Sequence, residues 1–217
     1  MIRIIKENKI ILIFYGLLLM AGIILHLFYS KTELHLFLNR FHSPFSDFFF
    51  ANITHGGNGI LVALVIILFG FIRFRWASVL LTSFLGSGIV VQLLKRFVFS
   101  EMKRPAFVFK EMEELYFVPG IDLHHHHSFP SGHSATAFAL FFSLAFIIRD
   151  RLLKWGCFIL ACVVAYSRVY LSQHFLGDIF AGSLIGLLAA LIFYWYFQKV
   201  NWVWIDLSFS ALFRKRK

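Results

Sequence analysis

The chain has 217 residues, of which 59% are hydrophobic and 15% are charged, against about 45–50% and 25% in typical soluble domains. This composition excludes an ordinary soluble domain, because a single core cannot hide so much apolar surface, and it indicates one membrane-embedded domain over residues 1–217. The formal net charge of +10 comes in short basic clusters between apolar runs, a pattern that argues against nucleic acid as a partner.

Six apolar stretches follow one another along the chain. Since a helix needs about 20 mostly apolar residues to cross a bilayer, we predict spans at 10–29, 57–72, 76–94, 131–148, 152–171 and 179–197. We expect the short second and fourth spans to draw on flanking residues. Apolar residues interleaved with polar ones between 30 and 56 predict an interfacial amphipathic helix. The predicted fold class is therefore all-α, a polytopic membrane protein with six transmembrane helices and one interfacial helix.

Lysines and arginines predict the orientation of these spans. With the N-terminus in the cytoplasm, 13 of the 21 basic residues, including those of the tail at 214–217, fall on the inside. Because cytoplasmic segments are enriched in lysine and arginine, we expect both termini to be cytoplasmic. All ten histidines then fall on the outer side or at the outer end of a span.

Three polar stretches stand at the predicted outer ends of the spans, and the one before the sixth span is the most informative. His174 and Asp178 are four residues apart, so on a helix both would point to one face. That spacing lets the carboxylate hold one imidazole nitrogen while the other is presented as a base or a nucleophile. Arg168 supplies a planar cation suited to phosphate.

The stretch that opens the fourth span reads Pro-Ser-Gly-His. A helix start welcomes an anion, because its N–H groups are unpaired and its dipole is positive. We expect Ser131 to cap the helix and donate to an oxyanion, Gly132 to permit close backbone approach, and His133 to be a second titratable imidazole. A serine that only caps the helix is the plainer interpretation.

The stretch that leaves the third span adds Lys95 and Arg104. Taken alone, Lys95 is compatible with a lysine that snorkels at a helix end. Chance is a poor explanation, however, for two histidines, an aspartate, two arginines and a lysine on one membrane face. Their convergence predicts a catalytic site that binds an anion.

These segments resemble the three signature motifs of the type-2 phosphatidic acid phosphatase superfamily, in its bacterial membrane branch: K-x6-R-P, P-S-G-H and S-R-x5-H-x3-D. The second motif matches at 130–133 and the third in full at 167–178. The first departs from the pattern, since eight residues separate Lys95 from Arg104. The two extra residues are expected to form a bulge or an extra turn, and Arg96 or Lys103 is an alternative phosphate ligand to Lys95.

The resemblance implies that His174 attacks phosphorus and forms a phosphohistidine, that Asp178 orients it, and that His133 protonates the leaving lipid oxygen. It also implies that the phosphate oxygens are held by Lys95, Arg104, Ser131, Gly132 and Arg168. No metal and no cofactor are implied, because cationic side chains fill the usual role of magnesium.

The substrates implied by the resemblance are a prenyl diphosphate such as undecaprenyl diphosphate, a lipid A phosphate, phosphatidylglycerol phosphate or phosphatidic acid. We favour the first two, which are presented on the outer leaflet. The implied location is the bacterial inner (cytoplasmic) membrane, with the active site on the periplasmic face. The sequence does not indicate the oligomeric state.

Two other classes of protein compete with a phosphatase. A membrane transporter or binding protein for an anion or a lipid, without hydrolysis, would need polar residues inside the spans, which are almost free of charge. A vanadium haloperoxidase carries similar motifs but is soluble and larger. The histidines at 124–127 invite a metal site, but adjacent histidines in a loop rarely reach one metal, and we favour a polar loop at the mouth of the site.

Overall fold

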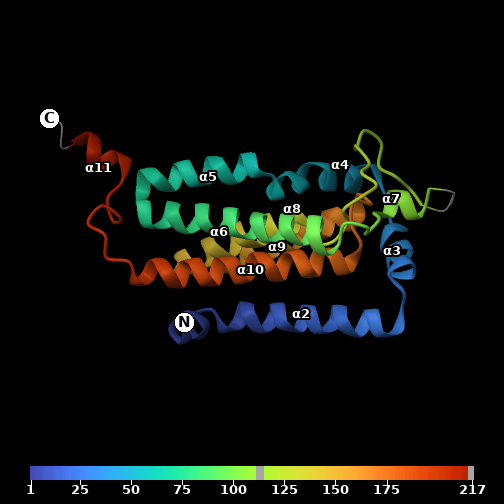
Figure 1. Cartoon of the computed structure of the whole chain (residues 1–217), viewed down its shortest axis with the longest axis horizontal. Coiled ribbons are helices and arrows are strands. Elements are labelled where there is room, and N and C mark those ends of the chain that lie inside the picture. The colour runs from blue at the N-terminus through green and yellow to red at the C-terminus, as the bar shows by residue number, and fades with distance from the viewer. Residues whose placement is uncertain (111–114, 215–217) are drawn as a thin grey trace.

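A computed structural model describes residues 1–110 and 115–214, and these residues form helices and loops without a β-strand (Figure 1). The last three residues of the basic tail lie outside the described residues. The helices are α1 (Ile2–Glu7), α2 (Lys9–Phe28), α3 (Lys31–Asn39), α4 (Pro44–Ile53), η1 (Thr54–Gly57), α5 (Gly59–Ile72), α6 (Phe74–Leu93), η2 (Leu94–Val98), α7 (Pro105–Val108), α8 (Gly132–Ile147), α9 (Arg151–Tyr170), α10 (Leu176–Lys199) and α11 (Phe209–Arg214).

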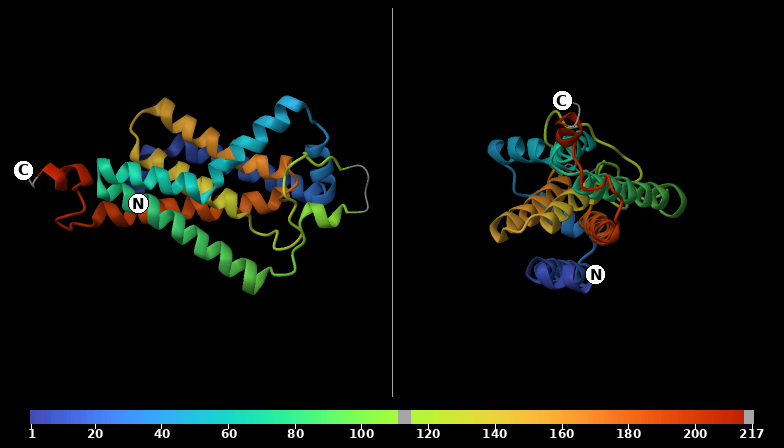
Figure 2. Two further views of the ribbon diagram at one scale, coloured as in Figure 1. Left: turned by 90° about the horizontal axis from the view of Figure 1, so that it is seen from above. Right: turned by 90° about the vertical axis from the view of Figure 1, so that its left-hand side faces the viewer.

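The long helices lie side by side in an elongated bundle (Figures 1 and 2). Helices α1 and α11 lie at one end of the bundle, on the left in Figure 1. Helices α3, α4 and α7 and the loop residues 115–131 lie at the opposite end. The starts of α8 and α10 and the end of α6 point to this second end, so all three predicted motifs gather there.

The predicted all-α membrane fold is confirmed, and the helix bounds agree with the predicted spans to within three residues. Within residues 1–110 and 115–214, four helices are long and apolar enough to cross a membrane, and α4–η1 with α5 forms a fifth candidate that is bent by 54°. Helix α8 has 16 residues and is shorter than the usual span. The count of six spans therefore stays a prediction. The segment predicted to hold one interfacial helix holds two, α3 and α4.

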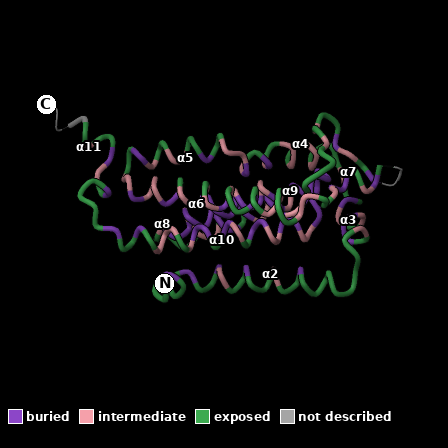
Figure 3. Tube along the Cα trace, viewed as in Figure 1, coloured by how far each residue is buried: buried purple, intermediate pink, exposed green. Residues whose placement is uncertain are grey.

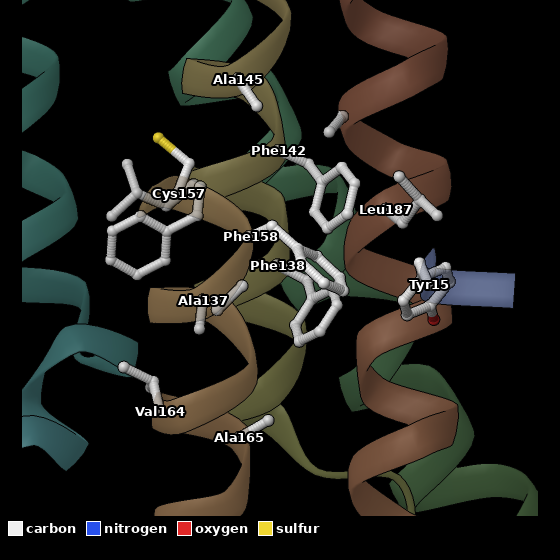
Figure 4. Close-up of a cluster of buried hydrophobic side chains, with 14 of the residues drawn as sticks. Tyr15, Ala137, Phe138, Phe142, Ala145, Cys157, Phe158, Val164, Ala165 and Leu187 are labelled. Atoms are coloured by element: carbon white, nitrogen blue, oxygen red, sulfur yellow. The ribbon is translucent and has the colours of Figure 1, made fainter. Parts of the chain in front are cut away.

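Helix α8 lies at the centre of the bundle, and most of its side chains are buried (Figure 3). Its phenylalanines pack with α2, α9 and α10, where Phe138 and Phe142 meet Tyr15 (Figure 4). The Tyr15 hydroxyl is 2.9 Å from the Ser183 hydroxyl and so links α2 to α10. A helix surrounded by protein need not reach both lipid boundaries, which explains how α8 can be short.

Two glycines of α10 allow it to approach α8 closely. A side chain at Gly182 would collide with the carbonyl oxygen of Ser131, and one at Gly186 with that of Ala135. Small residues at such spacing let two helices in a membrane pack backbone to backbone. This packing fixes the start of α8 against the first turns of α10.

The outward faces of the outer helices are apolar. Large hydrophobic side chains are exposed along α2, α5 and α6, among them Leu17, Leu64 and Ile89. In water such a surface would be an aggregation hazard, whereas in a bilayer it meets lipid tails. The high hydrophobic content that excluded a soluble domain is thus explained by the apolar side chains on the surface of the bundle.

Candidate active site

The segment between α9 and α10 forms a tight loop that presents His174. The backbone N–H groups of Gln173 and His174 both donate to the carbonyl oxygen of Arg168, at 2.9 and 3.1 Å. Ser172 adopts a positive φ of 52°, which helps the chain to reverse direction. The His174 side chain is only 2% exposed. The loop therefore holds this imidazole in one place at the end of the bundle.

Asp178 meets His174 in a way that the sequence interpretation got wrong. The prediction put both residues on one helix face, but α10 begins at Leu176 and His174 precedes it. Asp178 lies in the first turn, where its Oδ2 accepts from the Phe175 N–H at 3.0 Å and lies 3.3 Å from His174 Nδ1. A carboxylate in the first turn of a helix stabilises free N–H groups, and here it also reaches the preceding imidazole.

Ser128 is a third partner of this carboxylate, and the sequence analysis missed it. Its hydroxyl donates to Asp178 Oδ2, and its backbone N–H donates to the Met102 carbonyl at 3.0 Å. The Ser131 N–H in turn donates to the Asp178 carbonyl at 2.9 Å. These bonds join the start of α8 to the start of α10 and fix the carboxylate.

The contact with Asp178 sets the chemistry of His174. Donation from Nδ1–H to the carboxylate leaves Nε2 with its lone pair. Burial lowers the pKa of the His174 imidazole, and the nearby Arg104 and Arg168 lower it further, while Asp178 opposes them. The imidazole is therefore neutral at physiological pH, which is the state that a nucleophile requires.

The start of α8 supplies the second predicted motif. Ser131 is the N-cap: it is fully buried, and its Oγ accepts from the Ser134 N–H and hydroxyl at 3.4 and 3.0 Å. Gly132 is the first helical residue, so its N–H has no partner within the helix. His133 follows and lies within electrostatic range of His174 and of three cations, Arg168, Arg104 and Lys95.

Arg168 is buried beside the His174 loop. Its Nη1 donates to the Thr54 hydroxyl in η1 at 2.7 Å, and its Nε is buried without a hydrogen-bond partner among the described residues. Buried polar groups are nearly always paired in folded proteins. An anion that accepts from this guanidinium would satisfy the unpaired N–H. Thr54, like Ser128, was not identified from the sequence.

Arg104 is held by the backbone around it. Its Nε donates to the His126 carbonyl at 2.9 Å, and its Nη1 donates to the Gln173 carbonyl at 3.2 Å. The Arg104 N–H donates to the His125 carbonyl at 3.0 Å. The loop after α7 therefore fixes this guanidinium next to the residue that precedes His174.

The backbone around Lys95 accommodates the two extra residues of the first motif. The end of α6 widens into a π-type turn over Leu94–Val98, followed by turns up to residue 101, so an extra turn does occur where the helix ends. Lys95 lies within electrostatic range of Arg104, Asp178 and Arg168. Arg96 and Lys103, the alternative phosphate ligands, have other neighbours. Arg96 lines a groove on α6, and Lys103 Nζ lies 3.0 Å from His126 Nδ1.

The four histidines at 124–127 lie in the loop beside the site. The carbonyls of two of them hold Arg104, as described above. Burial lowers the pKa of the His124 imidazole, and the nearby Arg104 and Arg168 lower it further, while Asp122 opposes them. Over residues 1–110 and 115–214, no group of three or more His, Cys, Asp or Glu side chains is arranged to hold a metal ion.

Helix α3 braces the His174 loop from outside. His35 is fully buried, with Nε2 at 3.2 Å from the Ser172 hydroxyl, and its ring packs against Phe109 and Phe175. Asn39 Nδ2 donates to the same hydroxyl at 3.0 Å. Two residues of the predicted interfacial helix thus hold Ser172, two positions before His174, by hydrogen bonds.

His35 should make the protein less stable in mild acid. Burial lowers the pKa of His35 from 6.5 to about 4, so between these values the unfolded chain binds a proton that the folded chain does not. Stability is therefore lost as the pH falls through this window. Between about pH 7.5 and about pH 5.5 the loss should be about 1.4 kcal/mol. The His35→Asn variant should lack this part of the pH dependence in thermal melts.

The control for this experiment is His125→Asn, which changes an exposed histidine of the loop after α7. It should keep the pH dependence of the wild-type melting temperature. Equal pH dependence in wild type and His35→Asn would show that this imidazole is not the titrating group.

The arrangement defines a class of protein. The site combines a neutral imidazole backed by a carboxylate, a second imidazole, three cations and a helix start. Such groups are suited to phosphoryl transfer. They lie at one end of a helical bundle with an apolar exterior. The fold and the site together describe a membrane-embedded phosphoryl-transfer enzyme.

Comparison with known proteins assigns the family. Residues 76–202 match the model of the PAP2 superfamily, and the chain belongs to this superfamily. It is 29% identical over 178 residues to a lipid A 4'-phosphatase of Bacteroides thetaiotaomicron, covering 78% of each chain.

Two solved structures resemble the fold. The structure of Aquifex aeolicus LpxE matches with a TM-score of 0.66 and 27% identity, covering 76% of this chain and 95% of that one. A PAP2-type phosphatidylglycerolphosphate phosphatase from Bacillus subtilis matches with a TM-score of 0.67 and 20% identity, covering 91% of this chain and 98% of that one. The second match supports the fold alone.

Proposed function

We propose that the protein removes phosphate from a membrane lipid, with His174 as the nucleophile. Membership of the PAP2 superfamily and the phosphatases among its relatives make the chain a phosphoric ester hydrolase that acts on lipids. The contact of 3.3 Å between His174 Nδ1 and Asp178 Oδ2 is the observation that carries the proposed mechanism.

In the first step, His174 Nε2 attacks phosphorus. A bond from nitrogen to phosphorus forms, the bond from phosphorus to the lipid oxygen breaks, and His133, which begins the step as imidazolium, donates its proton to that leaving oxygen. In the second step, water attacks the phosphohistidine while His133 accepts its proton. The bond from nitrogen to phosphorus breaks, inorganic phosphate leaves, and both histidines return to their starting states. Asp178 stabilises the positive charge that His174 carries in between.

The phosphate oxygens are held by a cradle of donors. Arg168 presents an unpaired Nε–H, and Arg104 and Lys95 add positive charge. The start of α8, with Ser131 as cap and the free N–H of Gly132, receives another oxygen. Positioned cations and dipoles of this kind usually account for much of the rate enhancement of phosphoryl transfer.

The substrate is a lipid whose phosphate lies at the head-group depth of the outer leaflet. The site lies at the end of the bundle opposite α1 (Figure 1), and the basic residues favour a cytoplasmic α1, so we place the site on the periplasmic side of a bacterial inner membrane. An apolar groove of about 360 Å³ on α6, between Phe84 and Phe97, offers a path for the lipid tail. Similarity to a lipid A 4'-phosphatase favours lipid A phosphate, with prenyl diphosphate as the next candidate.

A panel of lipid phosphates tests this proposal. The purified protein in detergent is given lipid A, undecaprenyl diphosphate, phosphatidylglycerol phosphate and phosphatidic acid, and inorganic phosphate is measured. We expect release from at least one of them, and inhibition by vanadate. Absence of release from all four would favour a transporter or binding protein, and halide oxidation with vanadate would indicate a haloperoxidase.

Metal removal should leave the activity largely intact. The cradle described above consists of side-chain cations and backbone N–H groups, which can neutralise the charge of the phosphate by themselves. Phosphate release is measured before and after dialysis against EDTA, and again after addition of magnesium. Loss of most activity in EDTA with recovery in magnesium would contradict the proposed role of Arg104, Arg168 and Lys95.

A further inference from the structure

A cavity lies at the end of the bundle opposite the catalytic site. It has a volume of about 830 Å³. Its walls are α1, the start of α2, the start of α6, the end of α8, the start of α9 and the end of α10. The mechanism proposed above uses none of the residues that line it.

The rim of this cavity is strongly basic. Among the described residues, seven lysines and arginines line it against one acidic residue, Glu7. Glu7 pairs with Arg3 at 2.7 Å, and Arg73 pairs with Asp206, which lies outside the cavity, at 3.2 Å. Within the described part of the chain, the other five cations have no salt bridge. Lys154 donates to Asn8, whereas over residues 1–110 and 115–214 Lys6, Lys9, Arg149 and Arg151 also make no side-chain hydrogen bond. The nearby Asp150 does not line the cavity, and its carboxylate caps α9.

The deeper part of the cavity is apolar and aromatic. Ile11 and Phe146 are buried there, and Trp76, Trp155 and Tyr194 are partly buried beside them. Tryptophan and tyrosine favour the boundary between head groups and acyl chains. A basic rim above an aromatic floor matches a ligand with an anionic head and an apolar tail.

One wall of the cavity is a fixed part of the fold. The chain bends at Asn8, between α1 and α2, where Asn8 Nδ2 donates to the Ile4 carbonyl at 2.8 Å. Lys154 Nζ of α9 donates to Asn8 Oδ1 at 2.6 Å. Ile4 is buried in the core. These contacts hold α1 across the end of the bundle, so the cavity does not depend on a chance position of the N-terminal residues.

We propose that this cavity binds the head group of an anionic phospholipid from the leaflet opposite the active site. The four unpaired cations contact the phosphodiester, and the first part of an acyl chain packs on the aromatic floor. Basic pockets between transmembrane helices are suited to such head groups. The bound lipid joins α1 and α2 to α9 and so stabilises the folded protein without taking part in hydrolysis.

Thermal stability in detergent tests this proposal on the full chain. Phosphatidylglycerol is added to the micelles, with phosphatidylcholine as the neutral comparison. Phosphatidylglycerol carries only a phosphodiester, so the measurement does not depend on the proposed phosphatase activity. We expect it to raise the melting temperature by at least about 3 °C more than phosphatidylcholine does.

Two triple variants locate the effect. Lys6→Gln with Arg149→Gln and Arg151→Gln removes exposed cations of the rim. The control is Arg40→Gln with Lys110→Gln and Lys199→Gln, which removes the same charge outside the cavity. The extra stabilisation by phosphatidylglycerol should disappear in the first variant and persist in the second.

Three results would overturn the proposal. Equal stabilisation by the two lipids would show that the anionic head is not recognised. Equal loss in both triple variants would indicate attraction to the surface charge as a whole. Stabilisation of the same size by inorganic phosphate, lost in the rim variant, would assign the cavity to a soluble anion.

Discussion

Replacement of His174 by alanine should reduce phosphate release by at least about a thousandfold, because it removes the side chain that we propose forms the covalent intermediate. Release is measured with the best substrate of the lipid panel. Wild-type enzyme quenched during turnover with labelled substrate should also carry an acid-labile phosphate, which the variant should lack. The side chain is buried, so the variant must elute and melt as a folded protein for the comparison to hold.

The matched control is His125→Ala, which removes an exposed imidazole from the loop beside the site. It should retain most of the activity. If the His174 variant keeps even a tenth of the wild-type rate, another residue is the nucleophile.

Replacement of Arg168 by lysine should lower kcat/KM by at least about a hundredfold, although the charge is kept. A lysine cannot both donate to Thr54 and present a second N–H in the fixed direction of Nε. Steady-state kinetics should show a fall in kcat, because the lost donor acts on the charge that develops in the transition state.

Two further variants serve as comparisons for Arg168→Lys. Thr54→Val should cost less, about tenfold, because the guanidinium remains but is held less firmly. Arg40→Lys, at an exposed position of the same end of the bundle, should have wild-type kinetics. A wild-type kcat in Arg168→Lys would mean that positive charge alone is sufficient and that the direction of Nε does not matter.

The third motif and the long helices could be predicted because their information is local. An apolar run of sufficient length specifies a membrane helix in any context, and the bounds of α2 and α9 agree with the prediction to within one residue. The spacing in the third motif likewise identified His174 and Asp178 as partners. The predicted geometry was wrong because a helix start was read as a helix middle, and Asp178 acts from the first turn.

The residues that the sequence analysis missed act through long-range contacts. Ser128 is 50 positions from Asp178, Thr54 is 114 from Arg168, and His35 is 137 from Ser172. A serine, a threonine or a histidine at such distances carries no periodic or spacing signal. Only the packing of α3, η1 and the loop before α8 around the His174 loop gives them a role.

The central position of α8 has a consequence for where the enzyme can work. Bilayers differ in thickness by a few ångströms, and lipid-facing helices respond by tilting or by deforming the lipid around them. Helix α8 carries His133 and is shielded from lipid by its neighbours. A mismatch between bilayer thickness and helix length therefore acts first on the outer helices. The position of His133 should therefore tolerate changes in the length and order of the surrounding acyl chains.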